Sequence, residues 1–233
     1  MIQACRYGKK LASLIMASQI ELYQKYVLQR ALPLSEKVVE AYYHHPRHLF
    51  IPEYTIEEAY SDQALPLYAK GPFVSTISQP SFVLKILDLL KLEEGQKVFE
   101  LGTGSAWNTA LMAFIVGPTG KVVSVEVIPE MAERAKQTLK SFSVNNVLAI
   151  EGDGFEGYEA EAPYDRLIFT AGSTEFPEKL FTQLKEGGRM IFVRQHYLGY
   201  DVLEVTEKKD GKPVIVDSMP CSFVSVVRKK NPA

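Results

Sequence analysis

Cysteine is scarce in this chain, since Cys5 and Cys221 are the only two among 233 residues. The two lie far apart and match no spacing that is typical of a metal site. A disulfide scaffold is therefore disfavoured, and so is a cysteine-based zinc motif. Low cysteine usage is typical of a reducing compartment, and we expect a cytoplasmic protein.

An excess of either charge is also lacking. The 26 basic and 28 acidic residues give a formal net charge of -2 and are spread along the chain, so no basic face predicts nucleic-acid binding. No apolar stretch approaches the roughly 20 residues that a membrane helix needs, and we expect no membrane association. The 46% hydrophobic content supplies the core of one large domain, or of one domain with an appendage.

The N-terminal segment allows two interpretations. Three basic residues precede a short apolar run at 11–17, an order that resembles a signal peptide. The apolar positions also fit one face of a helix, and we favour an amphipathic helix over about 9–30 that stops near Pro33. A second helix is expected over 35–42, with Ser35 as its N-cap.

Little periodicity follows between Pro46 and Pro80, where five prolines accompany aromatic residues and acidic turns. We expect this segment to be irregular and to cover or wrap a site. The sequence therefore predicts a first domain over 1–80, made of N-terminal helices and an irregular lid or substrate segment. A second domain is predicted over 81–233.

From residue 81 onward, candidate helices and strands alternate. Helices are expected at 82–92, 109–116, 129–142 and 178–184, and strands at 97–101, 121–127, 147–151, 164–170 and 189–193. This alternation predicts a doubly wound α/β fold with a mostly parallel sheet. Two later candidates, 202–206 and 223–227, are separated by a charged turn and a short run, and are expected to be antiparallel.

Three of the predicted strands end in groups that suit a nucleotide-type ligand. Glycines in the turn 102–105 let the backbone approach a ligand closely. Glu126 would present a carboxylate to ribose hydroxyls, and Asp153 could accept a hydrogen bond from an adenine amino group while Phe155 packs nearby. Each feature alone also fits a plain turn or a solvated charge, but the three together favour a nucleotide-type ligand.

The glycine turn indicates which ligand this is. A dinucleotide fold expects Gly-x-Gly-x-x-Gly, whereas Trp107 stands at the third glycine position here. The acidic Glu100 before the turn disfavours a pyrophosphate and favours the cationic aminopropyl end of S-adenosylmethionine. The sequence therefore predicts a methyltransferase that uses this cofactor.

With these motifs in place, the chain resembles the protein-L-isoaspartate O-methyltransferase family over about residues 46 to 227. The matching stretches are 46–53, 59–62, 65–66, 75–80, 152–154, Gly157, 162–165, 170–171, Pro177 and 183–189. Of these, Ser75-Thr76-Ile77-Ser78-Gln79-Pro80 is the most specific to the family. The resemblance implies a Rossmann-like S-adenosylmethionine-dependent methyltransferase fold.

The resemblance also implies roles for individual residues. Ser78 would be the active-site serine at the substrate carboxylate, with Thr76, Ile77 and Asp62 as further substrate-binding residues. The plainer alternatives are a helix N-cap for Ser78 and a loop hydrogen-bond acceptor for Asp62. The implied cofactor residues are Glu100, Gly102, Thr103, Gly104, Ser105, Glu126, Val127, Asp153 and Gly154.

The implied reaction is methylation of L-isoaspartyl and D-aspartyl carboxylates in damaged proteins, followed by closure to a succinimide. A carboxylate with a pKa of about 4 is already the nucleophile at neutral pH, so no general base is required. A neutral hydroxyl such as Ser78 suits this chemistry, because it orients the anion without the strong pairing that an arginine would impose. Isoaspartyl peptides are the expected substrate.

Three departures from the family pattern keep alternatives open. They are Ala106-Trp107 after the glycine turn, Arg194-Gln195-His196-Tyr197 after the last parallel strand, and Ser225 near the end. The alternatives are a same-fold methyltransferase for another carboxylate or small molecule, and a non-catalytic cofactor-binding homologue. A metal site at His44, His45 and His48 is disfavoured, because Pro46 interrupts the helix and no further ligand completes the set. The sequence leaves the oligomeric state open.

Overall fold

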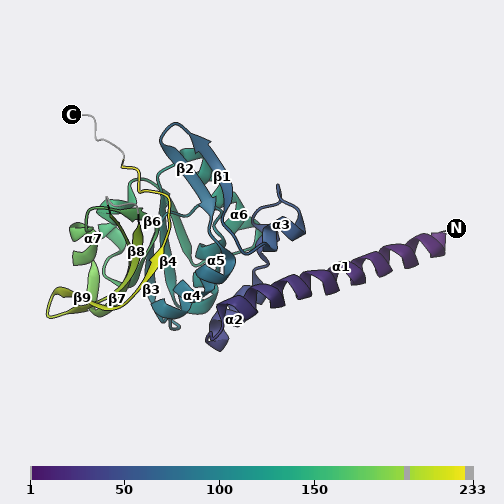
Figure 1. Ribbon diagram of the computed structural model, residues 1–233, viewed down its shortest axis with the longest axis horizontal. Coiled ribbons are helices and arrows are strands. Elements are labelled where there is room, and N and C mark those ends of the chain that lie inside the picture. The colour runs from purple at the N-terminus through teal and green to yellow at the C-terminus, as the bar shows by residue number, and fades with distance from the viewer. Residues whose placement is uncertain (1, 197–199, 229–233) are drawn as a thin grey trace.

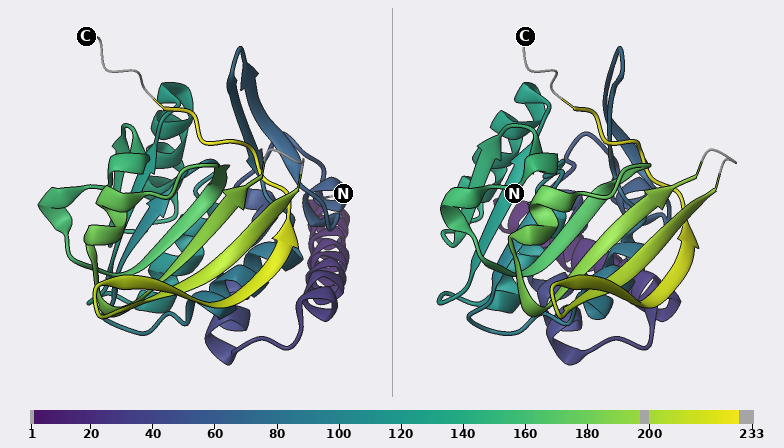
Figure 2. Two further views of the ribbon diagram at one scale, coloured as in Figure 1. Left: turned by 60° about the vertical axis from the view of Figure 1, so that its left-hand side comes forward. Right: turned by 90° about the vertical axis from the view of Figure 1, so that its left-hand side faces the viewer.

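The computed structural model describes residues 2–196 and 200–228. Its main sheet has seven strands in the order β5-β4-β3-β6-β7-β8-β9 (Figures 1 and 2). The strands are β3 (Lys97–Leu101), β4 (Lys121–Glu126), β5 (Val147–Glu151), β6 (Tyr164–Ser173), β7 (Leu184–Gln195), β8 (Asp201–Lys209) and β9 (Lys212–Cys221). Strands β3 to β7 pair in parallel, whereas β8 and β9 pair antiparallel. The expected doubly wound, mostly parallel sheet with antiparallel C-terminal strands is confirmed.

Alternating apolar side chains give the sheet two buried faces. Val98 and Ile168 belong to one hydrophobic cluster, while their neighbours Phe99 and Phe169 belong to another. The first cluster also contains side chains of the helices α4 (Pro80–Leu90), α5 (Trp107–Val116) and α6 (Pro129–Ser141). The second is closed by α7 (Glu178–Thr182) and the short 3₁₀ helix η2 (Gly154–Glu156), with a further turn, η3 (Glu159–Glu161), beside them. Helices therefore cover both faces, as parallel sheets require.

Two helices precede this sheet, α1 (Ile2–Ala31) and α2 (Glu36–His44). Helix α1 is a long rod that extends away from the body of the molecule (Figure 1). Within residues 16–31, Val27 and Ala31 are buried, whereas Leu22 is 67% exposed, and the helix contacts α3 and α4. The predicted N-terminal helices are present. Ser35 is the N-cap residue of α2, as predicted, but its hydroxyl makes no capping hydrogen bond.

The segment between Pro46 and Pro80, expected to be irregular, has regular elements, so this prediction was wrong. It contains the 3₁₀ helix η1 (Arg47–Leu49), helix α3 (Ile56–Tyr60), and an antiparallel hairpin of β1 (Leu65–Lys70) and β2 (Phe73–Ile77). The hairpin stands apart from the main sheet (Figure 1). The strand pattern of β1 was not recognised in the sequence because Pro66 lies inside this strand, beside a register shift, and proline within a segment argues against a strand.

The C-terminal prediction also needs correction. The strand that pairs with β8 is β9, not the predicted segment 223–227, which forms only an isolated bridge between Ser225 and Gly172. Strand β9 was missed because it is an exposed edge strand without a buried apolar face. Among the described residues, no helix is both long and apolar enough to cross a bilayer.

Candidate active site

A cavity opens at the carboxyl ends of β3, β4 and β6, where the strand order reverses. Its empty space is about 1030 Å³, including a part that is open to solvent. The end of β2 and residues 223–227 complete its wall. The predicted site residues that line it are Thr76, Ile77, Ser78, Gly102, Thr103, Gly104, Ser105, Glu126, Val127, Asp153 and Gly154. The sequence motifs of cofactor and substrate therefore meet in one cavity.

The first turn of this cavity depends on Gly102. Its φ of +92° lies in the region that favours glycine, and a Cβ there would lie 2.2 Å from the Thr170 hydroxyl oxygen. That hydroxyl donates to the carbonyls of Leu101 and Gly102, at 2.9 and 2.8 Å. Any side chain at residue 102 would break this packing. The turn can thus bring bare backbone against a ligand.

The carboxylate of Glu126 is held by the backbone of two loops. Its oxygens accept hydrogen bonds from the amides of Gly104, at 2.9 Å, and Ile128, at 3.0 Å. The residue is 95% buried yet lines the cavity. Because an ionised carboxylate has about four acceptor positions, Glu126 retains capacity for two further donors.

Glu100, by contrast, lies behind the cavity wall. It is fully buried and accepts hydrogen bonds from the side chains of Asn108 (2.7 Å), Thr109 (2.5 Å) and Ser124 (2.6 Å). Burial raises the pKa of Glu100 to about 7, against the lowering effect of those three donors. Glu100 therefore does not line the cavity and reaches it through Asn108, and through Ser124, whose hydroxyl is hydrogen-bonded to that of the lining residue Thr103 at 2.6 Å.

Asn108 is a site residue that the sequence reasoning missed. It lines the cavity, and its Oδ1 atom is buried with no hydrogen-bond partner in the described part of the chain. Buried amide oxygens are rarely left without a donor, so this atom is suited to a ligand's N–H group. The sequence did hold one indication of its role, since Asn108 is a lone amide side chain in the first turn of the otherwise apolar helix α5.

Ser78 is placed by its backbone rather than by its side chain. Its carbonyl accepts a 2.6 Å hydrogen bond from Nη1 of Arg47, while its own hydroxyl makes no hydrogen bond within the described residues. Arg47 is completely buried, donates from Nε to the Ala59 carbonyl at 2.7 Å, and lies over the Trp107 ring at 5.1 Å. Desolvation lowers the pKa of Arg47 to about 9. Arg47 thus joins the serine loop to the helix that follows the glycine turn.

Asp62 is not brought to the cavity. Its Oδ1 accepts from the Ser81 amide at 3.0 Å, and its Oδ2 accepts from the Ser81 hydroxyl at 2.9 Å and from Nε of Arg30 at 2.6 Å. The carboxylate thus satisfies an early amide of α4, in the manner of a helix cap. Gln79, not Ser78, occupies the N-cap position, and its side chain makes no capping bond.

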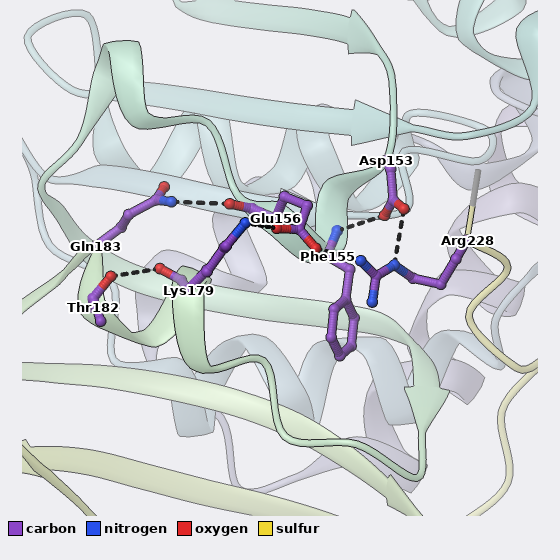
Figure 3. A network of polar contacts seen from close by, with 7 residues as sticks. All are labelled: Asp153, Phe155, Glu156, Lys179, Thr182, Gln183 and Arg228. Carbon is purple, nitrogen blue, oxygen red and sulfur yellow. Dashed lines mark hydrogen bonds and ion pairs between the residues drawn. The ribbon is translucent and has the colours of Figure 1, made fainter. Parts of the chain in front are cut away.

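Asp153 lines the cavity at the end that follows β5. Its Oδ1 accepts from the Phe155 amide at 3.0 Å, and its Oδ2 accepts from Nε of Arg228 at 2.8 Å (Figure 3). Phe155 packs against Phe169 in the second hydrophobic cluster and does not itself line the cavity. The sequence reasoning missed Arg228, and no sequence pattern links it to Asp153.

Among the departures from the family pattern, Ala106 and Arg194 lie off the cavity surface, whereas Trp107 lines the cavity. Ala106 is buried with a φ of +67° and does not line the cavity, so its methyl group does not narrow it. Arg194 forms a two-pronged ion pair with Glu204, at 2.7 and 3.0 Å. Ser225 does line the cavity. Tyr197 lies outside the described residues.

The histidines near Pro46 are engaged in other contacts. Among the described residues, no group of three or more His, Cys, Asp or Glu is arranged to hold a metal ion. His44 stacks on Phe114, and the ring of His48 is hydrogen-bonded to the Tyr60 hydroxyl at 3.0 Å.

The charges of the cavity lining favour a cationic ligand over an anionic one. Two residues with carboxylates, Glu126 and Asp153, line it, together with Asn108, whose buried amide oxygen has no partner among the described residues. In the described part of the chain the lining contains no lysine, arginine or histidine. A pyrophosphate would find no counter-charge there, whereas the ammonium and sulfonium groups of S-adenosylmethionine would meet acceptors. The residues fit that cofactor.

Comparison with known proteins gives the same answer. The family model of protein-L-isoaspartate(D-aspartate) O-methyltransferase matches residues 20–231. The chain belongs to this family. It is 49% identical to protein-L-isoaspartate O-methyltransferase 2 of Archaeoglobus fulgidus over 70% of this chain and 73% of that one. It is 39% identical to the Pyrococcus horikoshii protein-L-isoaspartate O-methyltransferase over 91% and 97% of the two chains.

Solved structures of the family have the same fold. A protein-L-isoaspartate O-methyltransferase superposes with a TM-score of 0.78 at 32% identity, covering 88% of this chain but 65% of the other. A second, from Plasmodium falciparum in complex with S-adenosyl-L-homocysteine, gives a TM-score of 0.70 at 20% identity, with 89% and 97% coverage. The family uses S-adenosylmethionine. The cofactor predicted from the glycine turn is confirmed.

Proposed function

We propose that this protein is an S-adenosylmethionine-dependent carboxyl O-methyltransferase acting on L-isoaspartyl and D-aspartyl residues of damaged proteins. One observation carries the proposal. A single cavity joins the glycine turn to the loop of Ser78, with carboxylates at the cofactor end and hydroxyls at the other. Family membership supports the same activity.

The proposed chemistry needs little from the side chains. When bound, S-adenosylmethionine supplies an electrophilic methyl group on a sulfonium sulfur. The hydroxyl of Ser78, which has no partner within the described residues, orients the substrate carboxylate toward it. No cation among the described lining residues pairs with that carboxylate, so its oxygen keeps its nucleophilicity. The ester then loses methanol to the neighbouring backbone nitrogen, and the succinimide partly hydrolyses to aspartate.

We further propose a division of labour along the chain. Residues 1–80, with Thr76, Ile77 and Ser78, hold the substrate, while Asp62 supports their loop through α4. Residues 81–233 hold the cofactor, with Glu126, Asp153 and the glycine turn as its contacts and Glu100 acting through Asn108. The low cysteine content supports the cytoplasm as the place of action.

A methyl-transfer assay with a peptide pair tests the proposed function. Two peptides of one sequence, linked through isoaspartate in one and aspartate in the other, are incubated with protein and methyl-labelled cofactor. We expect ester on the isoaspartyl peptide alone. Equal labelling of both peptides would indicate another carboxylate substrate. Cofactor binding without labelling of either would indicate a non-catalytic homologue, and both results contradict the proposal.

A further inference from the structure

Arg228 makes three contacts at the end of the cavity that follows β5. Its Nε donates to Oδ2 of Asp153 at 2.8 Å, and its Nη2 donates to Oε1 of Glu156. The guanidinium also lies over the ring of Phe155, 4.3 Å from the ring centroid. Figure 3 shows the arginine reaching toward all three residues from the C-terminal segment. A planar guanidinium can form a fork of hydrogen bonds and stack on an aromatic ring at once, which lysine cannot.

The segment that carries this arginine runs along the cavity wall. We call residues 222–228 the C-terminal strap. The strap follows the edge strand β9 and is hydrogen-bonded to Gly172 of β6. The Gly172 amide donates to the Val224 carbonyl at 2.8 Å, and the Gly172 carbonyl accepts from the Val226 amide at 2.7 Å. The views in Figure 2 show it passing over the carboxyl ends of the strands. Residues 223–227 line the cavity, so the strap forms part of its wall.

The strap therefore has two anchors with the cavity wall between them. Gly172 holds its middle, and the contacts of Arg228 with Asp153, Glu156 and Phe155 hold its end. Asp153 both accepts from Arg228 and lines the cavity. One side chain thus fixes the position of a cofactor-end carboxylate and of the segment that closes over it.

We propose that Arg228 is a positioning residue that latches the C-terminal strap across the adenine end of the cofactor cavity. The inference rests on the proposed function, since Asp153 marks the adenine end only if the cavity holds S-adenosylmethionine. The latch slows cofactor dissociation by keeping Val227 over the cavity and the Asp153 carboxylate in place. It plays no part in the transfer step itself.

The chain offers a matched control for this latch. Lys179 pairs with the other oxygen of Glu156 at 2.6 Å, and its side chain is 78% exposed. It thus places the same charge on the same carboxylate, but it belongs to α7 and touches neither Asp153 nor the strap in the described contacts. Arg228 is also exposed, by 40%. Exposed ion pairs contribute little to stability, so both Arg228→Gln and Lys179→Gln are expected to fold.

The test measures binding and dissociation of S-adenosylhomocysteine in the full-length protein, by calorimetry and stopped flow. We expect Arg228→Gln to raise the Kd about 5- to 30-fold, mostly through faster dissociation, with kcat at saturating cofactor within about twofold of wild type. Arg228→Lys should recover only part of the loss. Lys179→Gln should bind like wild type.

Three outcomes would overturn the latch. They are an unchanged Kd in Arg228→Gln, an equal weakening in Lys179→Gln, and tighter binding in Arg228→Gln, which would mean that the arginine competes with adenine for Asp153. Failure of the proposed function gives a different result, because it appears in the wild-type protein itself, either as no binding of S-adenosylhomocysteine or as binding without selective labelling of the isoaspartyl peptide. Added salt should bring the wild-type dissociation rate toward that of the variant.

Discussion

At the scale of single residues, Arg47 connects the two halves of the site. A buried guanidinium is costly to desolvate, and here the cost is offset by backbone carbonyls and an aromatic ring instead of a direct carboxylate partner. Since one of those carbonyls belongs to Ser78, the arginine sets the position of that loop. Its effect on turnover is therefore indirect.

Replacing Arg47 by lysine tests this positioning role. The substitution keeps the charge but removes the fork of donors, and we expect the free energy of unfolding to fall by about 1–3 kcal/mol. The kcat/KM for an isoaspartyl peptide should fall by about tenfold or more, with a smaller change in cofactor affinity. Denaturant unfolding, peptide kinetics and calorimetry measure the three quantities. Wild-type peptide kinetics in Arg47→Lys would rule the role out.

The buried Glu100 predicts a pH dependence of cofactor binding. Its pKa of about 7 is raised by desolvation, so its contribution to stability is full below about pH 4.5 and is lost as the pH rises through 7. A cationic ligand held beyond Asn108 favours the ionised form. We therefore expect wild-type affinity for S-adenosylmethionine to rise several-fold between pH 6 and 8. Glu100→Gln should flatten this profile, and a flat wild-type profile would contradict the coupling.

At the scale of elements, the parallel strands and the long helices were predictable because their apolar patterns are strong. The hairpin of β1 and β2 and the edge strand β9 were not, since proline interrupts the first and the second lacks a buried face. For residues 223–227 the sequence predicted a strand that the structure does not contain. Their apolar pattern reflects a cavity wall and not a paired strand.

Helix α4 gives a prediction at this scale, because Asp62 caps it from a distant loop. Removing the carboxylate in Asp62→Ala leaves the Ser81 amide without its acceptor, and we expect a loss of about 2 kcal/mol in unfolding free energy. Thr55→Ala is the control, since it removes the exposed cap of the five-residue helix α3. It should cost about 1 kcal/mol or less. Equal losses would show that Asp62 does not act through α4.

At the scale of the whole molecule, the N-terminal helices and the cofactor domain share one hydrophobic cluster. Val27 of α1 and Leu84 of α4 are both fully buried in it. We expect Val27→Ala to cost about 1–3 kcal/mol and to shift a single unfolding transition. Leu22→Ala, on the exposed face of the same helix, should change stability by less than about 0.5 kcal/mol. Two separate transitions would show that residues 1–80 unfold independently.

The motifs of the site could be predicted from the sequence, but the residues that hold those motifs in position could not. The glycine turn and the Ser78 motif carry their chemistry in consecutive residues, which a sequence displays directly. Asn108 was marked only by its place in an apolar helix, whereas Arg47 and Arg228 act through contacts across the fold: Arg228 lies 75 positions from Asp153. No local pattern reports such distances.

In the proposed function, one cavity holds the cofactor at the glycine turn and the substrate carboxylate at Ser78. The most direct test compares wild type with Ser78→Ala for kcat/KM on an isoaspartyl peptide and for the Kd of S-adenosylmethionine. Loss of a hydrogen bond to a charged group predicts a fall in kcat/KM of about 10- to 100-fold, with the Kd within about twofold. Undiminished turnover in Ser78→Ala would contradict the account.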